Sequence, residues 1–313
     1  MAFEYNNWPL VSVVTVNYNQ SMVTGEFLSS FKKITYPNTE IFVVDNASKE
    51  EDHAGSIKEK FPYIHFIQNK ENLGFAGGNN TALPYCKGKY ILFINNDTEV
   101  EKGFLEPLVD VLESDPSIAM VSPKIHYFHT PETFQFAGFT GINSITIRNF
   151  ALGFGKKDIG QYDVTCETGS IFGAAMLVSM EVIKKVGMMA ENFFLYYEEH
   201  DWADHMKRAG YKIYYQGKSL VLHKESISTV KESPFQIFYL TRGRILFARR
   251  NNKGFRKVLS LLYLFTVAVP KQALRFLLKG RSDLSFASWK SVWWHWTHYK
   301  NIYGLPRLTQ IKN

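Results

Sequence analysis

The stretch YILFINND, Tyr90–Asp97, is an apolar run that ends abruptly in polar side chains. Aromatic and branched aliphatic residues in such a run are typical of a buried β-strand. Asn95, Asn96 and Asp97 at its end contribute little to packing, but amide and carboxylate oxygens are well suited to hold a divalent metal ion and a nucleotide. The stretch therefore predicts a buried strand that ends at a ligand site.

Upstream of this stretch, expected strands alternate with expected helices. The strands cover residues 10–16, 40–44, 65–68 and 90–95, and helical patterns cover 22–33, 50–60 and the residues after the glycine-rich segment 72–80. This alternation predicts an α/β fold with a doubly wound, mostly parallel sheet and right-handed crossovers. In such a sheet, ligands bind beyond the carboxyl ends of the strands.

Polar residues follow several of these strand ends and should meet at one edge of the sheet. They are Asn17, Tyr18, Asp45, Asn95 and Asp97. For Asp97 alone, a turn or a helix cap is the simpler reading, because Asn-Asp-Thr favours local backbone hydrogen bonds. Its place beside the other polar strand ends instead favours Mg²⁺ or Mn²⁺, bound mostly through the phosphates of a substrate.

Two further residues have alternative roles that the pattern leaves open. Tyr18 could stack on a nucleobase, and Asp45 could accept a hydrogen bond from a pyrimidine imide or a ribose hydroxyl. Equally, Tyr18 could close the core and Asp45 could cap the next helix. The chain contains neither G-x-G-x-x-G after its first strand nor a P-loop, which argues against a Rossmann dehydrogenase and a P-loop ATPase.

Three acids, Glu198, Glu199 and Asp201, are crowded at the start of an expected helix, directly after the aromatic segment FFLYY. The helix dipole alone favours acids in a first turn. However, a carboxylate at the mouth of an aromatic-walled crevice can have its pKa raised, which suits a general base. His223, at the end of the last expected strand, is either a metal ligand or a structural histidine. Zinc is not expected, because no histidine pair has H-E-x-x-H spacing.

The second half of the chain predicts a less regular structure. Residues 118–165 predict an irregular region over the crevice, followed by a buried strand within 169–180, a short helix at 181–186, a helix at 198–210, and a closing pair of strands at 211–215 and 219–223.

The charge of the 313-residue chain is unevenly distributed. The total is +7, but the segment from Arg242 to the end has 15 Lys and Arg and one acid, Asp283, which leaves −7 on the remainder. Apolar stretches such as Val258–Pro270 and the Trp-rich segment 291–304 lie between the basic residues. The longest apolar run is about a dozen residues, fewer than the roughly 20 that cross a bilayer. The tail is therefore expected to lie on an anionic membrane surface, not through it.

The tail also suits two arrangements that involve no membrane. It could be a helical subdomain packed on the core, or its aromatic residues could form an oligomer contact. Nucleic acid is not expected as a partner, because no recognition motif accompanies the charge. Cys86 and Cys166 are expected to be free thiols, and the N-terminus lacks the pattern of a secretion signal. The expected location is therefore cytoplasmic, on the inner face of the cell membrane.

With these segments assembled, the chain resembles glycosyltransferase family 2, the inverting nucleotide-sugar transferases of the GT-A fold, and especially its rhamnosyltransferase-like members. The resemblance runs from about Leu10 to His223. It is carried by VSVVTVNYNQ, IFVVDNAS, NKENLGFAGGNN, YILFINNDTEV, GAAMLV and FFLYYEEHDW, followed by VLH. It implies a GT-A catalytic domain at 1–240, with a nucleotide-binding half at about 8–117 and an acceptor half at about 118–240, and a basic helical extension at 241–313.

The resemblance also implies roles for individual residues. Asp97 stands in the Asp-x-Asp metal motif of the family, with Asn95 in place of the first Asp, and His223 completes the shell of an Mn²⁺ or Mg²⁺ ion. The implied nucleotide-sugar site consists of Thr15, Asn17, Tyr18, Asn19, Asp45, Asn72, Gly74, Asn79, Asn95 and Asn96. The Glu-Asp pair of the family falls on Glu198 and Glu199, which ranks Glu199 first as the base, then Asp201, then Glu198.

The implied reaction moves one sugar from a nucleotide-diphosphate sugar to a hydroxyl of a saccharide or lipid-linked saccharide in cell-surface polysaccharide synthesis. One sugar per encounter is expected, because the chain lacks the Gln-x-x-Arg-Trp motif associated with processive synthases. The alternative from another class is a non-catalytic saccharide- or membrane-binding protein on a transferase-like fold.

Overall fold

The computed structural model describes residues 8–224, 232–300 and 305–308. The described strands are β1 (Val11–Asn17), β2 (Thr39–Asp45), β3 (His65–Gln68), β4 (Tyr90–Ile94), β5 (Thr98–Val100), β6 (Ile118–Tyr127), β7 (Thr130–Phe136), β8 (Thr165–Glu167), β9 (Ala175–Ser179) and β10 (Lys212–His223). The α-helices are α1 (Ser21–Phe31), α2 (Gly55–Lys60), α3 (Gly74–Ala82), α4 (Glu106–Ser114), α5 (Met180–Val186), α6 (Glu198–Arg208), α7 (Pro234–Asn251), α8 (Gly254–Tyr263), α9 (Val269–Leu278) and α10 (Ser282–Thr297).

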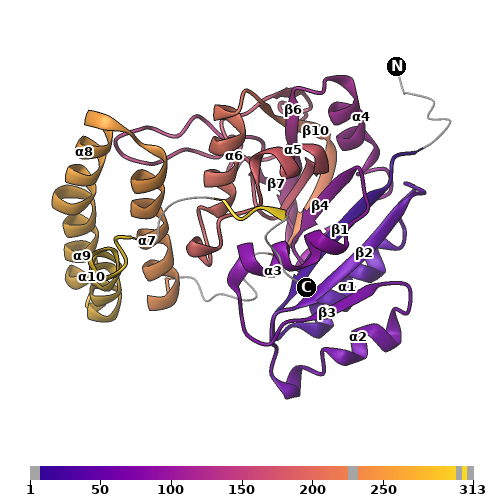
Figure 1. Ribbon diagram of the computed structural model, residues 1–313, viewed down its shortest axis with the longest axis horizontal. Coiled ribbons are helices and arrows are strands. Elements are labelled where there is room, and N and C mark those ends of the chain that lie inside the picture. The colour runs from indigo at the N-terminus through magenta and orange to yellow at the C-terminus, as the bar shows by residue number, and fades with distance from the viewer. Residues whose placement is uncertain (1–7, 225–231, 301–304, 309–313) are drawn as a thin grey trace.

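All of these strands belong to one sheet, with a separate group of helices beside it (Figure 1). The strand order is β3-β2-β1-β4-β9-β6-β10-β5, with β7 paired to β6 and β8 paired to β10. The first four strands in this order are parallel neighbours, as predicted. Asn17 lies opposite Asp45 in the register of β1 and β2, so the polar ends of these strands meet at one edge.

The side chains of the central strands alternate between two apolar cores on opposite faces of the sheet. Along β4, Tyr90, Leu92 and Ile94 belong to one core, which α1 and α4 cover. Ile91 and Phe93 belong to the other, to which α3 and α6 contribute. Because β4 is buried on both faces, its sequence is continuously apolar.

The second half differs from the prediction in two respects. The segment 118–165 is not irregular throughout, because β6 is a ten-residue strand that pairs with β10, β7 and β9. Lys124 interrupts its apolar pattern, but the Lys124 ammonium is paired with Asp158 and Asp163. The predicted pair of closing strands is one strand, β10, with an irregularity between Gln216 and Leu220.

The glycine-rich segment also differs from the prediction, since it forms part of a helix instead of preceding one. α3 begins at Gly74 and contains Gly77 and Gly78. Its small residues let this helix pack closely on β1 and β2. Cys86 and Cys166 are free, as predicted.

The tail helices α7–α10 form the group at the left of Figure 1. The predicted domain boundary between residues 240 and 241 lies inside α7, of which Thr241–Arg250 is buried. The predicted apolar run lies within a longer helix, because α8, a π-helical segment at Leu264–Ala268 and α9 form one helix, Gly254–Leu278. By length and composition alone this 25-residue helix could cross a membrane, and 22% of its most apolar window is buried.

Candidate active site

A cavity of about 380 Å³ lies at the carboxyl ends of β1, β4 and β10. Eight residues predicted from the sequence line it: Tyr18, Asn72, Gly74, Asn79, Asn95, Asn96, Asp97 and His223. Aromatic side chains form much of the remaining wall, namely Phe75, Phe172, Phe194, Tyr196 and Phe235. A polar floor with aromatic walls suits a ligand that has both a ring system and polar groups.

Asp97 and His223 meet in the wall of this cavity although they are 126 positions apart in the sequence. Asp97 Oδ1 lies 3.1 Å from His223 Nε2, and both side chains are nearly buried. On the other side of the ring, His223 Nδ1 lies 2.7 Å from the amide oxygen of Gln135. An amide oxygen only accepts hydrogen bonds, so Nδ1 carries the proton there. In the neutral imidazole, Nε2 is then an acceptor that faces the acceptor Asp97.

Two acceptors at this distance require a positive charge that both can contact, either a proton on Nε2 or a cation bound beside them to both atoms. A histidine that donates its other ring N–H to a fixed oxygen has the arrangement usual for a metal ligand. Among the described residues no group of three or more His, Cys, Asp or Glu is placed to hold a metal ion. The residues present therefore fit a divalent cation that takes two protein ligands and completes its shell with substrate oxygens and water.

Asn17 and Asp45 lie beneath the cavity, not in its wall. Asn17 Nδ2 donates to Asp45 Oδ1 at 2.9 Å, and the fully buried Asp45 carboxylate also accepts from the backbone N–H of Ser48 at 3.1 Å. The second contact is a local turn bond and not the helix cap of the alternative prediction, because the next helical segments begin at Glu50 and Gly55 without a side-chain cap. These bonds hold the ends of β1 and β2 in place under the ligand space.

The other predicted residues at the end of β1 are divided between the core and the surface. Thr15 is fully buried, and the side chain of Asn19 accepts a hydrogen bond from the backbone N–H of Lys49 at 2.8 Å. Neither lines the cavity, whereas Tyr18 lines it with 39% of its surface exposed. Tyr18 therefore does not close the core and is available for stacking.

Asn46 was missed by the sequence interpretation and organises one wall of the cavity. Its Nδ2 donates to Asn72 Oδ1 and to the carbonyl of Gly74, both at 3.0 Å. Its Oδ1 accepts from Asn69 Nδ2 at 3.0 Å and from the backbone N–H of Leu73 at 3.1 Å. The sequence feature that could have identified Asn46 was its position directly after Asp45, at the same polar strand end.

The loop before α6 contains the aromatic segment FFLYY, which the sequence predicted beside an aromatic-walled crevice, and its backbone is unusual. Phe194, Tyr196 and Tyr197 have φ angles of 63°, 67° and 76°, a region that residues other than glycine rarely adopt. Phe194 and Tyr196 line the cavity together with Leu195. Such conformations persist only where surrounding contacts enforce them, and they are concentrated at functional sites.

Arg242 of α7 is one of the contacts that enforce this loop. Its guanidinium donates to the carbonyls of Asn192, at 2.9 Å, and Phe193. It also lies 4.7 Å from the ring centroid of Tyr239 and 4.6 Å from that of Trp294. Burial lowers the pKa of Arg242 to about 10. The tail helices therefore help to shape the cavity wall.

We expect Gly74→Ala to destabilise the protein, because Gly74 has φ of +71° and an added Cβ would lie 2.2 Å from the carbonyl oxygen of Phe194. The strain and the overlap together should cost about 1–3 kcal/mol. Denaturant titration measures this change as a free energy of unfolding. The matched control is Gly55→Ala in α2, where an added Cβ meets nothing within 4 Å and stability should not fall. Equal effects of the two substitutions would contradict the close contact between α3 and the loop.

Glu199 lies against the same edge of the sheet as Asp97. An added Cβ at Gly173 would lie 3.8 Å from Glu199 Cδ and 3.6 Å from Cζ of Phe75, a residue that lines the cavity. The next residue, Ala174, accepts a hydrogen bond from the backbone N–H of Asn95 at 2.9 Å. Glu199 Oε2 is shielded from solvent and has no hydrogen-bond partner among the described residues. The carboxyl group therefore lies close to the cavity wall at Phe75, although Glu199 is not among the residues that line the cavity.

Glu198 has a different environment, because its side chain is almost completely buried. Burial raises the pKa of the Glu198 carboxyl well above its ordinary value, and the charge of Glu199 raises it further. Both effects hold Glu198 toward its neutral form. Glu198 Oε2, like Glu199 Oε2, is shielded from solvent without a hydrogen-bond partner among the described residues.

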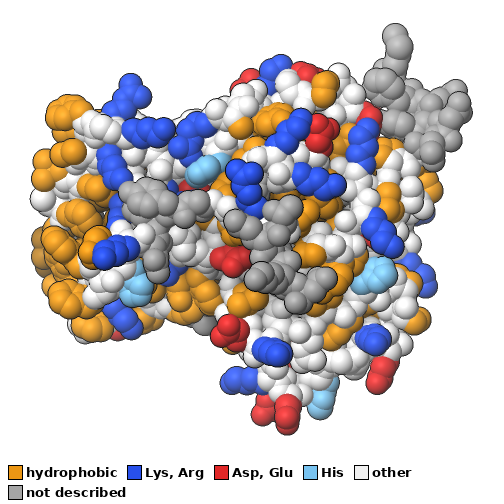
Figure 2. Space-filling view, in the orientation of Figure 1, with side chains coloured by type: hydrophobic (Ala, Val, Ile, Leu, Met, Phe, Trp, Pro, Cys, Tyr) orange, Lys and Arg blue, Asp and Glu red, His pale blue; other side chains and the backbone are white. Residues whose placement is uncertain are grey.

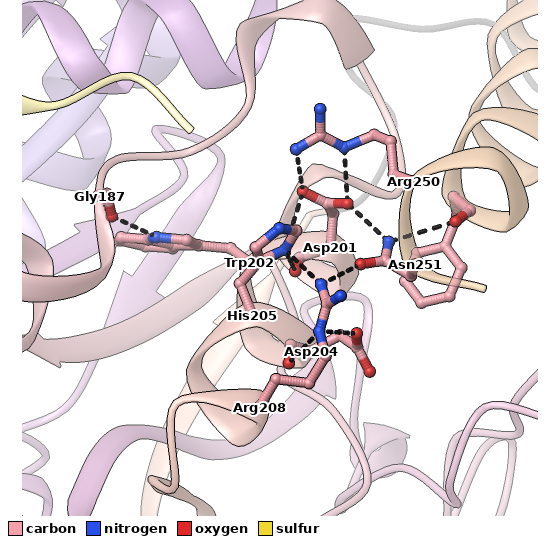
Figure 3. Close-up of polar contacts among 9 residues, drawn as sticks. Gly187, Asp201, Trp202, Asp204, His205, Arg208, Arg250 and Asn251 are labelled. Carbon is pink, nitrogen blue, oxygen red and sulfur yellow. Dashed lines mark hydrogen bonds and ion pairs between the residues drawn. The ribbon is translucent and has the colours of Figure 1, made fainter. Parts of the chain in front are cut away.

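Asp201 is fully buried and joins α6 to α7 (Figure 3). Arg250 donates from Nε to Asp201 Oδ1 at 2.9 Å and from Nη2 to Oδ2 at 3.0 Å, and Asn251 Nδ2 donates to Oδ1 at 2.7 Å. Asp201 does not line the cavity. With both oxygens bound, this carboxylate has a structural environment that the sequence did not reveal.

Comparisons with known proteins identify the family and the fold. The model of the family described as Glycosyl transferase family 2 matches residues 12–187. The low-salt glycan biosynthesis hexosyltransferase Agl10 of Haloferax volcanii is 23% identical over 272 residues, which are 83% of this chain and 81% of that protein. The UDP-Glc:alpha-D-GlcNAc-diphosphoundecaprenol beta-1,3-glucosyltransferase WfgD of Escherichia coli is 33% identical over 88 residues, 28% of this chain and 35% of that protein.

A solved structure with a similar fold is the mannosyltransferase PcManGT from Pyrobaculum calidifontis in complex with GDP-Man and Mn²⁺. It superposes with a TM-score of 0.58 at 14% identity, over 94% of this chain and 76% of that one. The fold is therefore the predicted GT-A type. Because the family match covers more than half of the residues, the chain belongs to glycosyl transferase family 2.

Proposed function

We propose that the protein is an inverting glycosyltransferase that moves one sugar from a nucleotide-diphosphate sugar to a hydroxyl of a saccharide or lipid-linked saccharide in the synthesis of a cell-surface glycan. The observation that carries this proposal is that Asp97 and His223 meet in a cavity that Tyr18 lines and Glu199 borders. The names of two relatives support it, since one is a hexosyltransferase of glycan biosynthesis and the other a glucosyltransferase named for a diphosphoundecaprenol-linked acceptor.

The donor would occupy the cavity with its base against Tyr18. Polar contacts to its ribose, diphosphate and sugar would come from Asn72, Asn79, Asn95 and Asn96, and the backbone at Gly74 lies beside them. Asp97 and His223 would hold Mn²⁺ or Mg²⁺, which when bound would offset negative charge on the diphosphate. The bound GDP-Man and Mn²⁺ of the structural relative support this arrangement.

Glu199 would act as the general base. It accepts the proton of the acceptor hydroxyl, and the oxygen forms a bond to the anomeric carbon of the donor sugar. The bond from that carbon to the diphosphate oxygen breaks, and its electron pair leaves with the nucleoside diphosphate. Attack from the face opposite the leaving group inverts the configuration at the anomeric carbon. Tyr18, Asp97 and Glu199 contribute by holding the two reactants in line.

The proposal predicts that Mn²⁺ and a sugar nucleotide together raise the melting temperature of the protein. A ligand that binds only the folded state stabilises it by about 2.7 kcal/mol at a hundred times its Kd. A thermal-shift panel of UDP-, GDP- and dTDP-sugars with Mn²⁺ measures this rise in melting temperature and identifies the nucleobase of the donor. Asp97→Asn should abolish the metal-dependent part of the shift, and Asp115→Asn, at an aspartate that pairs with Lys212, should not. A shift that Asp97→Asn leaves unchanged would contradict the site.

A further inference from the structure

The tail helix α10 buries mostly small side chains and exposes large apolar ones, which is the reverse of the usual arrangement. Its buried residues are mostly small, namely Leu284, Ser285, Ala287, Ser288, Ser291 and His295. On the opposite face, Phe286, Trp289, Trp293 and Trp296 recur at intervals of three or four residues and are 71%, 46%, 70% and 70% exposed. A helix adapted to water has its large apolar residues inside and its polar residues outside. This face of α10 is therefore built for contact with something other than water.

The helix beside α10 also exposes large apolar side chains. Along α8 and α9, the large exposed apolar residues are Phe255, Val258, Leu262, Leu274, Leu277 and Leu278. We call these residues, together with the four of α10, the apolar face of the tail. Figure 2 shows hydrophobic side chains gathered over these helices, at the left of the view. A face of this extent marks an interaction site, because soluble proteins rarely leave one exposed.

Basic residues accompany the apolar face. Exposed Lys and Arg on the same helices are Arg256, Lys271, Arg275, Lys279 and Lys290, and Asp283 is the single acid from Arg242 onward. Tryptophan between cations is typical of the interface of a bilayer that carries anionic lipids. A second copy of this chain fits less well, because two such faces would bring their cations together.

The packing of α8 and α9 favours a position on a membrane over a position across it. One side of this helix is buried against the other tail helices through Ser260, Leu264, Val269, Ala273 and Phe276. Within this packing, Gln272 Nε2 donates to Thr241 Oγ1 at 2.9 Å and to Ser288 Oγ at 3.1 Å. A helix that crossed a bilayer alone would lose these hydrogen bonds and expose the amide to lipid.

We infer that the apolar face of the tail docks on the headgroup region of an anionic lipid bilayer, with α8, α9 and α10 parallel to the surface. α7, the innermost of these helices, contributes Phe235 and Gln236 to the wall of the cavity. Docking therefore holds the cavity close to the membrane, where a lipid-linked acceptor is anchored. The class of acceptor rests on the proposed function, whereas the membrane contact does not.

Vesicle flotation of the full chain tests this inference. The chain should float with phosphatidylcholine vesicles that contain phosphatidylglycerol and bind weakly to vesicles of phosphatidylcholine alone. The double variant Trp293→Ser/Trp296→Ser should bind at least about tenfold more weakly, because it removes apolar area that enters the interface. The matched control is Tyr63→Ser/Tyr85→Ser, which removes two exposed aromatic residues of the sheet domain and should bind like the parent.

Four results would overturn the inference. The first three are equal flotation of the two double variants, failure of the parent chain to float, and a dimer in solution that the tryptophan variant abolishes while vesicles are not bound. The fourth is resistance of the membrane-bound chain to extraction by alkaline carbonate, which would show a spanning helix instead of a surface one. The thermal shift with Mn²⁺ and a sugar nucleotide is measured on the same samples. A chain that shows this shift but does not bind vesicles contradicts the membrane inference and leaves the transferase proposal intact.

Discussion

Replacing Glu199 with glutamine should lower the rate of sugar transfer by about a hundred- to ten-thousand-fold and leave donor binding intact. The amide keeps the shape of the side chain and removes its negative charge and with it the capacity to accept a proton. Glu199 is placed for this role because its Oε2 has no partner among the described residues and its carboxyl group lies beside Gly173 at the border of the cavity. Release of nucleoside diphosphate gives the rate, and the thermal shift gives the donor affinity.

Glu198→Gln is the matched control for this experiment. Because burial and the charge of Glu199 raise the pKa of Glu198, its carboxyl group is held toward the neutral form that an amide mimics. Turnover should stay close to that of the parent. A raised folded-state pKa also means that this group stabilises the fold at low pH and that its contribution is lost as the pH rises through that pKa. Glu198→Gln should not show this loss of stability as the pH rises. Collapse of turnover in Glu198→Gln with activity retained in Glu199→Gln would make Glu198 the base.

Asp201→Asn should destabilise the fold by about 3–5 kcal/mol, because Arg250 would keep a buried charge without its anionic partner. The two side chains are 0% and 2% exposed, so water cannot replace the lost interaction. Denaturant titration of the parent and the variant gives the difference. Glu181→Gln, which removes the exposed partner of Lys185, should change stability much less.

The double variant Asp201→Leu/Arg250→Met separates a structural from a catalytic Asp201. Replacing both members of a buried ion pair by apolar residues is often neutral, so much of the lost stability should return. If the role of Asp201 is structural, turnover in the double variant should return together with stability. If Asp201→Asn remains as stable as the parent but transfers no sugar, Asp201 is the base and its link to α7 is secondary.

The ends of the first strands could be predicted because each carries its signal within a few residues. In β4 the apolar run and the polar residues after it are adjacent, so both the strand and Asp97 could be recognised. β6 could not, because Lys124 is compatible with a buried strand only through Asp158 and Asp163, which lie 34 and 39 positions away. A local pattern does not contain such partners.

The same limit applies to the residues missed in the site. Gln135 orients His223 from β7, and nothing in that strand's sequence marks it. Asp201 was ranked as a possible base from its place in the acid cluster. Its partner Arg250 lies 49 positions downstream, in a segment expected to form a separate extension. The backbone of Phe194 and Tyr196 could not be predicted either, since aromatic residues rarely adopt positive φ unless tertiary contacts enforce it.

Diffraction from crystals grown with Mn²⁺ and the nucleotide that gives the largest thermal shift tests most directly whether these residues form one donor site. The anomalous signal of manganese locates the ion independently of the protein atoms. We predict a peak bonded to Asp97 and His223, with the diphosphate beside it and the base against Tyr18. A manganese peak that contacts neither residue, or a nucleotide bound outside this cavity, would contradict the site and with it the proposed transferase.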